Sequence, residues 1–270
     1  MSQSLSERIE RLLVVSRKSL AQRLNRTRPS DRRTAFVAGV QRSGTNMVMD
    51  VLERSFETDV YHEYDSRAFS RYEMRERPVI RELVEKSPAS MVIIKALCEL
   101  QELQDLLDDF APSKAVWMFR SYHDVINSHI ARWVGMPDSI AKIVQNRESA
   151  GWRGRGMSDA THALVKDLYT PDMSNATACA LFWYFRNLLF FERAYDEDPR
   201  ILAVHYDRLV TEPTTQFPKV FGFLELEYSK RVSSSVFASS VGKRLAPELD
   251  PRVHALCDEL TEQIQAVVSD

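Results

Sequence analysis

The chain has 270 residues, of which 44% are hydrophobic and 27% are charged, so it can bury a large core. Its formal net charge of −2 argues against general binding to nucleic acids. The charge is unevenly spread, because residues 1–33 carry nine Lys or Arg against three acidic residues and leave the remaining chain acidic.

Residues 1–28 are expected to form a basic amphipathic helix, followed by a linker that ends at residue 33. Apolar residues recur there at near-helical spacing, with arginines between them: Leu5, Ile9, Leu12, Leu13, Leu20 and Leu24. Three roles fit such a helix. It can pack as an arm on its own domain, pack on the second subunit of a homodimer, or contact an anionic membrane surface peripherally.

The cysteines and the N-terminal apolar run indicate a cellular compartment. Cys98, Cys179 and Cys257 are scattered through apolar or helical contexts without metal-ligand spacing, so we expect reduced cysteines in the core. Reduced cysteines suit a reducing compartment. The apolar run Leu12–Val15 is too short for a signal peptide or a membrane span. We therefore expect a soluble, cytoplasmic protein. If residues 1–28 contact a membrane, we expect that contact to be peripheral and at the inner membrane surface.

From residue 34 onward, strand and helix patterns alternate along the chain. Short apolar stretches predict buried strands at residues 34–40, 59–63, 90–96, 113–120 and 200–206. Helical patterns separate these stretches, and that order predicts a parallel sheet covered on both faces. We therefore expect a single α/β domain over residues 34–270, with a three-layer α/β/α architecture.

Two segments depart from this alternation. Residues 144–162 are polar and hold three of the eight glycines, which predicts a mobile loop that could gate an acceptor site. Residues 174–197 are apolar on almost all sides, which predicts a buried helix. Trp183, Phe185 and Phe190 on that helix are expected to be core residues rather than a binding pocket.

The stretch "GVQRSGTN", residues 39–46, reads as an anion-binding loop between the first strand and the next helix. Gly39 and Gly44 allow close backbone approach, and the free N–H groups and dipole of a helix start favour phosphate or sulfate. A nucleotide-hydrolysing loop would follow its second glycine with a lysine and a metal-binding hydroxyl. Thr45 and Asn46 stand there instead, and Arg42 is the only cation of the loop.

A second anion site is expected at the end of the fourth strand. Arg120 ends that strand, and Ser128 and Arg132 follow at a spacing that places them on one face of the next helix. Two guanidinium groups and a hydroxyl can clamp a phosphate. The alternative is that Arg120 pairs with Asp124, which can cap the helix, and that Arg132 is solvated. Lys95 ends the third strand, and no carboxylate for a metal stands out on a later strand.

Together these motifs resemble those of the sulfotransferases that use 3′-phosphoadenosine 5′-phosphosulfate (PAPS), which have a P-loop NTPase-like fold. "VAGVQRSGTNMVMDVL" resembles their 5′-phosphosulfate loop, and its "RSGT" is closest to the tyrosylprotein and related bacterial enzymes. "WMFRSYHDVINSHIAR" resembles their 3′-phosphate motif, although Ser121 and Tyr122 stand where Asn or Asp and Pro are common. "ILAVHYDRLVTEPTTQFPKVFGFL" resembles a later segment of the family. The similarity covers roughly residues 34–132 and 200–245.

The resemblance implies a role for individual residues. The 5′-phosphosulfate would be held by Arg42, Ser43, Gly44, Thr45 and Asn46. The 3′-phosphate would be held by Arg120, Ser128 and Arg132, with Lys243 or Arg244 of "SSVGKR" added to that clamp. Lys95 would lie against the transferring sulfuryl group and Tyr206 near the nucleotide. PAPS would be the co-substrate and 3′,5′-adenosine bisphosphate (PAP) the product, with no metal required.

Transfer also needs a base that accepts the proton of the acceptor hydroxyl. The tyrosylprotein relatives carry a Glu in the corresponding loop, where this chain reads "DVYHEYDSRAF". Glu63 is the preferred base because it stands at the matching place, with His62 and Asp65 as alternatives. The acceptor class stays open among sugars, lipids and small molecules.

Two other functions compete with this hypothesis. One is a kinase or nucleotide hydrolase with a degenerate loop, which would need ATP and Mg²⁺. The other is a non-catalytic module that binds nucleotides. The absence of the loop lysine and metal-binding hydroxyl argues against the first, and the nearby acidic residues argue against the second.

Overall fold

A five-stranded parallel sheet forms the centre of the computed structural model, which describes residues 18, 22, 28, 31–238 and 241–268. Its strands lie in the order β2 (Thr58–Tyr61), β5 (Met91–Ala96), β1 (Arg33–Gly39), β6 (Ser113–Phe119) and β7 (Ile201–His205). Each matches one of the five expected strands to within two residues. A short antiparallel pair, β3 (Phe69–Ser70) and β4 (Glu73–Met74), was not predicted.

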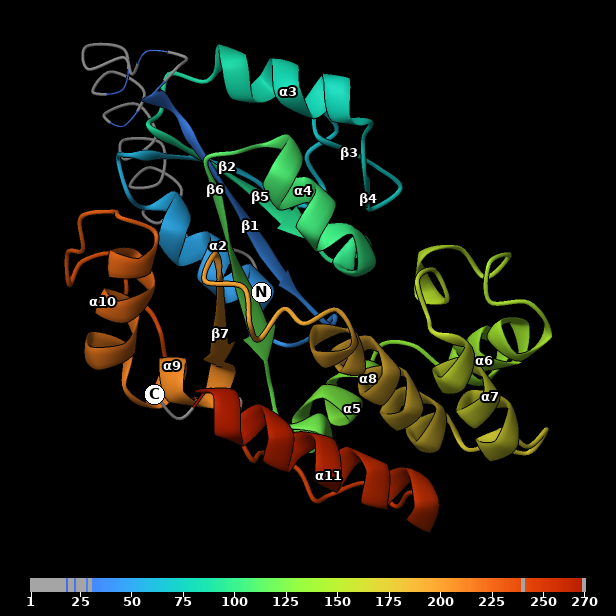
Figure 1. Ribbon diagram of the computed structural model, residues 1–270. Coiled ribbons are helices and arrows are strands. Elements are labelled where there is room, and N and C mark those ends of the chain that lie inside the picture. The colour runs from blue at the N-terminus through green and yellow to red at the C-terminus, as the bar shows by residue number, and fades with distance from the viewer. Residues whose placement is uncertain (1–17, 19–21, 23–27, 29–30, 239–240, 269–270) are drawn as a thin grey trace.

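Helices cover both faces of this sheet, which confirms the three-layer α/β/α architecture. The helices on the face that α8 covers are α4 (Leu103–Asp109), α5 (Tyr122–Ile130), α6 (Met136–Gln145), α7 (Asp159–Leu168), α8 (Asn175–Glu192) and α11 (Pro251–Val268). Those on the opposite face are α2 (Thr45–Glu53), α9 (Tyr206–Thr211) and α10 (Pro213–Phe223). The helix α3 (Arg77–Lys86) packs through Ile80 on the α8 side. Figure 1 shows α2 and α10 on one side of the sheet and α4 and α8 on the other.

Side chains of the central strand alternate between these two layers. Phe36 and Ala38 belong to the core on the α8 side, whereas Ala35 and Val37 belong to the core on the α2 side. Successive residues of a strand point to opposite faces, so a strand that is apolar throughout can feed two cores at once. The continuous apolar runs of the sequence have this origin.

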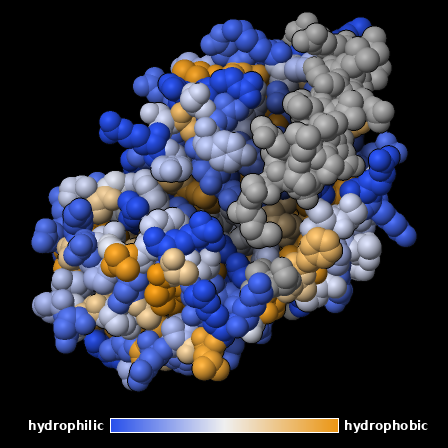
Figure 2. All heavy atoms as spheres, turned by 180° about the vertical axis from the view of Figure 1, so that it is seen from behind, coloured by the Kyte–Doolittle hydropathy of each residue, from blue (hydrophilic) through white to orange (hydrophobic). Residues whose placement is uncertain are grey.

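The helix α8 is buried as predicted, and the free cysteines Cys98, Cys179 and Cys257 are buried as well. Trp183 is 1% exposed and lies in the core on that side of the sheet. Among the described residues, no helix is long and apolar enough to cross a membrane. Figure 2 shows the molecule from behind, where hydrophobic residues are scattered over a mainly hydrophilic surface around the grey region.

The expected N-terminal helix falls almost wholly outside the described residues. Lys18 and Gln22 are described, and both contact the chain around the edge strand β2. The Lys18 ammonium group donates to the carbonyl of Glu53 and the hydroxyl of Thr58, and Gln22 donates to the carbonyls of Phe56 and Thr58. Burial lowers the pKa of Lys18 to about 8, against the opposing effect of Glu53. These two side chains therefore pack on the domain to which they belong.

The segment 144–162 is more structured than its composition predicts. The helix α6 extends into it and α7 begins inside it, and a 3-10 turn, η3 (Gly151–Arg153), lies between them. A second 3-10 turn, η2 (Leu100–Glu102), precedes α4. Nη1 of the buried Arg186 donates to the carbonyl of Trp152 at 3.0 Å, which ties η3 to α8.

Candidate functional site

The loop between β1 and α2 turns sharply at Gly44, which precedes the first residue of α2. Gly44 has a φ of 89°, and a Cβ on it would lie 2.0 Å from Cδ2 of Tyr206. A side chain at this position would therefore be strained and would collide with the tyrosine ring. Arg42 also has a positive φ, 74°. The loop thus presents its backbone to the start of α2, where N–H groups and the helix dipole favour an anion.

Two expected anion-binding motifs meet directly at Arg42. Its Nε donates a 2.8 Å hydrogen bond to Oγ of Ser128 on α5, and its carbonyl accepts a 3.1 Å hydrogen bond from Nη1 of Arg120. Burial lowers the pKa of Arg42, and the charges of Arg132 and Arg120 lower it further. Three guanidinium groups therefore converge on one place, where a polyanionic ligand would offset their mutual repulsion.

Arg120 lies at the end of β6 and is held from several sides. Its guanidinium group stacks on the ring of Tyr206, 4.4 Å from the centroid, and Nη2 lies 3.6 Å from Oδ2 of Asp124. Its carbonyl accepts a hydrogen bond of 3.2 Å from the indole N–H of Trp183. Tyr206 thus connects the first loop to Arg120, because its ring also covers Gly44.

Asp124 pairs with Arg120, and Arg132 is exposed, as the alternative interpretation of this motif expected, but the residue before α5 is Ser121 rather than Asp124. The helix begins after Ser121, and Asp124 lies in its first turn, where it accepts a 3.1 Å hydrogen bond from the backbone N–H of Gly242. The carboxylate therefore connects Arg120 to the late segment of the chain. Tyr122, at an unusual place for the motif, donates to Asp258 on α11 at 2.6 Å and so anchors the start of the helix.

The remaining cations of the expected 3′-phosphate clamp lie at its rim. The helix α5 ends at Ile130, so Arg132 lies in the turn beyond it rather than on its face, and it is exposed. Lys243 and Arg244 are exposed too, and Nη1 of Arg244 lies 3.4 Å from the carbonyl of Asn127 on α5. A cavity of about 240 Å³ beside the start of α5 is lined by Ser121, His123, Asp124, Asp207, Val241, Gly242, Arg244 and Ala246.

The other end of the site is built around Lys95 on β5. Its side chain is 1% exposed, and Nζ donates a 2.5 Å hydrogen bond to Oε2 of Glu63 and another to Oδ1 of Asn46. Burial lowers the pKa of Lys95, and the carboxylate of Glu63 opposes this effect. The structure thus brings three expected site residues together. Ser43 and Thr45 are buried beside them in the loop.

The two alternative bases point to other partners. His62 is 4% exposed, and its Nε2 lies 3.9 Å from the carboxylates of both Asp50 and Glu53. These three residues bring ligand atoms within 4.8 Å of one another, so they are the group among the described residues that could hold a metal ion. Asp65 pairs with Arg67 at 2.6 Å, and this hydrogen bond lowers the pKa of Asp65. Of the three candidates, Glu63 is the one joined to Lys95.

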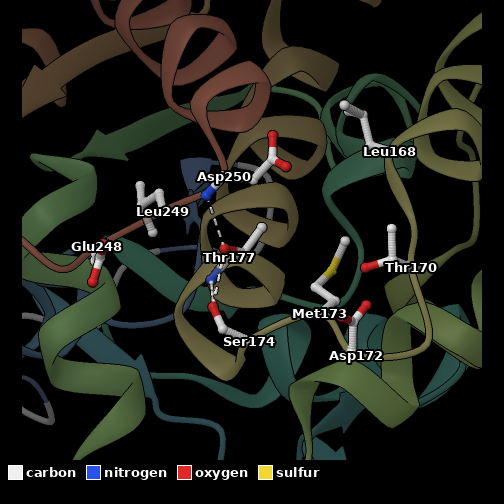
Figure 3. A pocket seen from close by; sticks show the side chains of 9 residues that line it. All are labelled: Leu168, Thr170, Asp172, Met173, Ser174, Thr177, Glu248, Leu249 and Asp250. Atoms are coloured by element: carbon white, nitrogen blue, oxygen red, sulfur yellow. Dashed lines mark hydrogen bonds between the residues drawn. The ribbon is translucent and has the colours of Figure 1, made fainter.

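Another cavity lies away from this site, between the start of α8 and the segment before α11 (Figure 3). Its volume is about 310 Å³, and it is lined by Leu168, Thr170, Asp172, Met173, Ser174, Thr177, Glu248, Leu249 and Asp250. Three of these residues are acidic and none is basic. An anionic nucleotide would be repelled there, so the basic site at the sheet edge is the better candidate.

Sequence reasoning missed two residues that support this site. Trp183 was assigned to the core alone, yet its indole N–H fixes the carbonyl of Arg120. His129 was not singled out, and its Nε2 lies 3.3 Å from the carbonyl of Gln41 in the first loop. Burial lowers the pKa of His129 to about 4, although the hydrogen bond with Gln41 opposes this. The positive charges of Arg42 and Arg153 lower the pKa further. Its position next to Ser128 was the signal available in the sequence.

The fold and the site define an α/β protein in which three guanidinium groups converge at a strand–loop–helix turn. Comparison with known families agrees with this description. The chain belongs to the sulfotransferase domain family, whose model matches residues 32–243.

Solved structures support the same fold. The sulfotransferase domain from the curacin biosynthetic pathway has a TM-score of 0.53 and 12% identity, over 85% of this chain and 98% of that one. The sulfotransferase domain from the Synechococcus PCC 7002 olefin synthase has a TM-score of 0.51 and 11% identity, over 85% and 94%. A sulfotransferase from Alicyclobacillus acidocaldarius has a TM-score of 0.50 and 14% identity, over 88% and 93%. Among curated proteins, no significant match was found.

Proposed function

We propose that this protein transfers a sulfuryl group from PAPS to a hydroxyl group of an acceptor. The observation that carries the proposal is the meeting of the Arg42–Ser128 pair with the Lys95–Glu63 pair at one edge of the sheet. The first pair suits the phosphates of the donor. The second places a cation and a carboxylate beside the same loop, where transfer would occur.

Donor binding would use the residues that surround the first loop. The start of α2 and the Arg42 guanidinium group would hold the 5′-phosphosulfate, with Ser43, Gly44, Thr45 and Asn46 forming the turn. Arg120, Ser128 and Arg132 would hold the 3′-phosphate, and Lys243 or Arg244 would cover it. The residues fit this ligand, because three guanidinium groups converge beside the start of α2.

The residues of the site can account for every bond and proton of the transfer step. The acceptor oxygen would attack sulfur and form a new S–O bond, while the bond between sulfur and the 5′-phosphate oxygen breaks and PAP leaves. The hydroxyl proton would pass to Glu63, which acts as a general base. Lys95 and Arg42 would stabilise the charge that develops on the sulfuryl oxygens and on the departing phosphate. No step needs a metal ion.

The N-terminal helix would act as an arm of its own domain. The contacts of Lys18 and Gln22 with the β2 region support this role. The alternatives are an arm that packs on a second subunit and a peripheral contact with the cytoplasmic face of the inner membrane. In this proposal the arm covers an edge strand, which would otherwise present unpaired backbone groups.

A ligand comparison tests the proposed function. Thermal shifts are measured with PAP without metal, and with ATP and Mg²⁺. Stabilisation by PAP alone is expected, whereas stabilisation only by ATP with Mg²⁺ would favour a kinase or hydrolase. Mass spectrometry of hydroxyl compounds incubated with the enzyme and PAPS then detects an added sulfuryl group. Tight binding of PAP without transfer to any acceptor would favour the non-catalytic nucleotide-binding module.

A further inference from the structure

The turn η3 is fixed beside the strand that carries Lys95. Arg186 of α8 is 1% exposed, and its guanidinium group bridges two carbonyls. Nη1 donates to Trp152 at 3.0 Å, and Nη2 donates to Leu97 at 3.2 Å. Leu97 directly follows β5 and lies two residues after Lys95. A charge buried in this way holds its partners firmly, because breaking either bond leaves a guanidinium N–H unsatisfied.

Aromatic rings connect the same turn to the first loop. The ring of Trp152 lies edge-on to Phe182 with centroids 6.0 Å apart, and Phe182 lies edge-on to His129 at 6.2 Å. His129 contacts the carbonyl of Gln41 in the loop. The charge of Arg153 also contributes to the low pKa of His129, after burial and Arg42. The turn η3 is therefore close to the donor loop as well as to β5.

Arg153 of this turn carries a positive charge that forms no ion pair with a carboxylate in the described part of the chain, although Glu73 is near enough to act on it electrostatically. Its guanidinium group stacks on the ring of Trp152, 4.4 Å from the centroid, and it is partly buried. Among the described residues, no carboxylate lies within ion-pair distance of it. Two residues along, Arg155 has two such partners, Glu73 at 3.5 Å and Glu102 at 3.8 Å. Burial lowers the pKa of Arg153, and Cys98 and the carboxylate of Glu73 oppose this effect. An anion in direct contact with the guanidinium group would offset its burial further.

The strand order indicates which substrate this charge faces. The donor motifs follow β1, β6 and β7, whereas Glu63 follows β2 and Lys95 lies on β5. An acceptor that gives its proton to Glu63 must therefore lie on the β2–β5 side of the donor. The bond from Arg186 to Leu97 holds η3 beside the end of β5, which is that side.

We propose that Arg153, held flat on Trp152, binds an anionic group of the acceptor, so that the substrate is a hydroxyl compound already carrying a negative charge. This inference rests on the proposed function. A carboxylate fits the planar guanidinium group with two parallel hydrogen bonds, and a sulfate or phosphate ester offers the same oxygens. Arg153 would be a residue that determines acceptor specificity.

The test measures binding to the enzyme–PAP complex, so that it does not depend on turnover. Calorimetry compares 4-hydroxyphenylacetate with neutral 4-hydroxyphenylethanol, and glucuronic acid with glucose. At least one anionic member is expected to bind roughly tenfold more tightly than its neutral partner. Arg153→Met should remove this preference, Arg153→Lys should restore part of it, and Arg155→Met should retain it as the matched control.

The outcomes separate the two proposals. Equal affinity within both pairs, no binding of either anion, or an equal loss of preference in Arg155→Met would overturn the role of Arg153. The thermal shift by PAP is measured in the same samples and should be the same in all variants. Its absence from the wild-type protein would count against the proposed function, whereas its loss only in Arg153→Met would show that Arg153 serves the donor.

Discussion

Lys95 and Glu63, which come from neighbouring strands, are joined by a 2.5 Å hydrogen bond between Nζ and Oε2. The lysine side chain is 1% exposed, so the carboxylate is its main source of compensation for burial. This pair places the expected base, Glu63, beside the lysine that is expected to stabilise the developing negative charge, before any substrate binds. It also means that changing either residue alters the charge balance of the other.

Replacing Glu63 tests the base. We expect Glu63→Gln to lower turnover by about 10²-fold or more, the usual size of a lost general base. The affinity for PAP should change little, because the residues proposed to hold the donor follow β1, β6 and β7. Steady-state kinetics with a responsive acceptor and the thermal shift with PAP measure the two effects.

A substitution in the same turn serves as the control. Asp65 is bound to Arg67 rather than to Lys95, so Asp65→Asn should retain turnover within a few-fold. If Asp65→Asn loses as much turnover as Glu63→Gln, the base is not assigned to Glu63. A larger loss in His62→Gln than in Glu63→Gln would transfer the role to the histidine.

The contact between Arg42 and Ser128 should contribute to donor affinity. Ser128→Ala removes the hydroxyl that accepts from Nε of Arg42 at 2.8 Å and that could also contact the ligand. Hydrogen bonds to charged groups contribute about 1.5–3 kcal/mol, so PAP should bind roughly tenfold or more weakly. Calorimetry measures the dissociation constant. Ser139→Ala on α6 is the control, and equal affinity in both variants would remove Ser128 from the donor site.

Gly44 should tolerate no side chain. Gly44→Ala would place a methyl group 2.0 Å from the ring of Tyr206 at a φ of 89°, so the loop or the tyrosine must move. Strain of this kind costs about 1–3 kcal/mol, and we expect lost stability together with lost stabilisation by PAP. Gly135→Ala is the matched control, since a Cβ there would meet nothing within 4 Å. Similar melting curves for both variants, with and without PAP, would refute this account.

Glu99 should make stability decrease as pH rises. Burial raises its pKa from 4.5 to about 7, although the N–H of Met74, 2.7 Å from Oε1, opposes this. Between these two values the unfolded state binds fewer protons than the folded state, so the free energy of unfolding falls with increasing pH. Glu99→Gln should remove this part of the pH dependence, on the order of 2–3 kcal/mol.

Urea denaturation at pH 5 and pH 8 measures the effect. The free energy of unfolding of Glu99→Gln minus that of the wild type should be larger at pH 8 than at pH 5. The exposed residue Glu197 provides the control, because Glu197→Gln should leave the pH profile unchanged. If Glu99→Gln shows the same pH dependence of unfolding free energy as the wild type, the Glu99 carboxyl group is not its source.

Local features of the sequence were sufficient for the strands and the donor loop. The central strands β1, β5 and β6 are mainly apolar, because each feeds cores on both faces of the sheet. The turn at Gly44 depends on the conformation of its own residue, and the place of Ser128 follows from one helix, although that helix ends before Arg132. Such features depend on neighbours within a few residues, so they could be predicted without knowledge of the fold.

Contacts between distant segments could not be predicted in this way. Asp124 was considered as a local helix cap, yet its carboxylate accepts a hydrogen bond from the N–H of Gly242, 118 residues later. Likewise, the segment 144–162 reads as a polar loop, because nothing near it in sequence indicates that Arg186 would bind the carbonyl of Trp152.

The sequence by itself therefore determined the architecture and the family, and it named the residues that we propose for the donor site. The tertiary structure decided which of the candidate bases reaches Lys95, and which arginine of the segment 151–155 has no carboxylate of the described chain within ion-pair distance. Both outcomes depend on where the chain brings charges that are 32 or more residues apart, as in the Lys95–Glu63 bond. Opposite charges lower their free energy only when folding holds them within a few ångströms, and composition and spacing do not specify that distance.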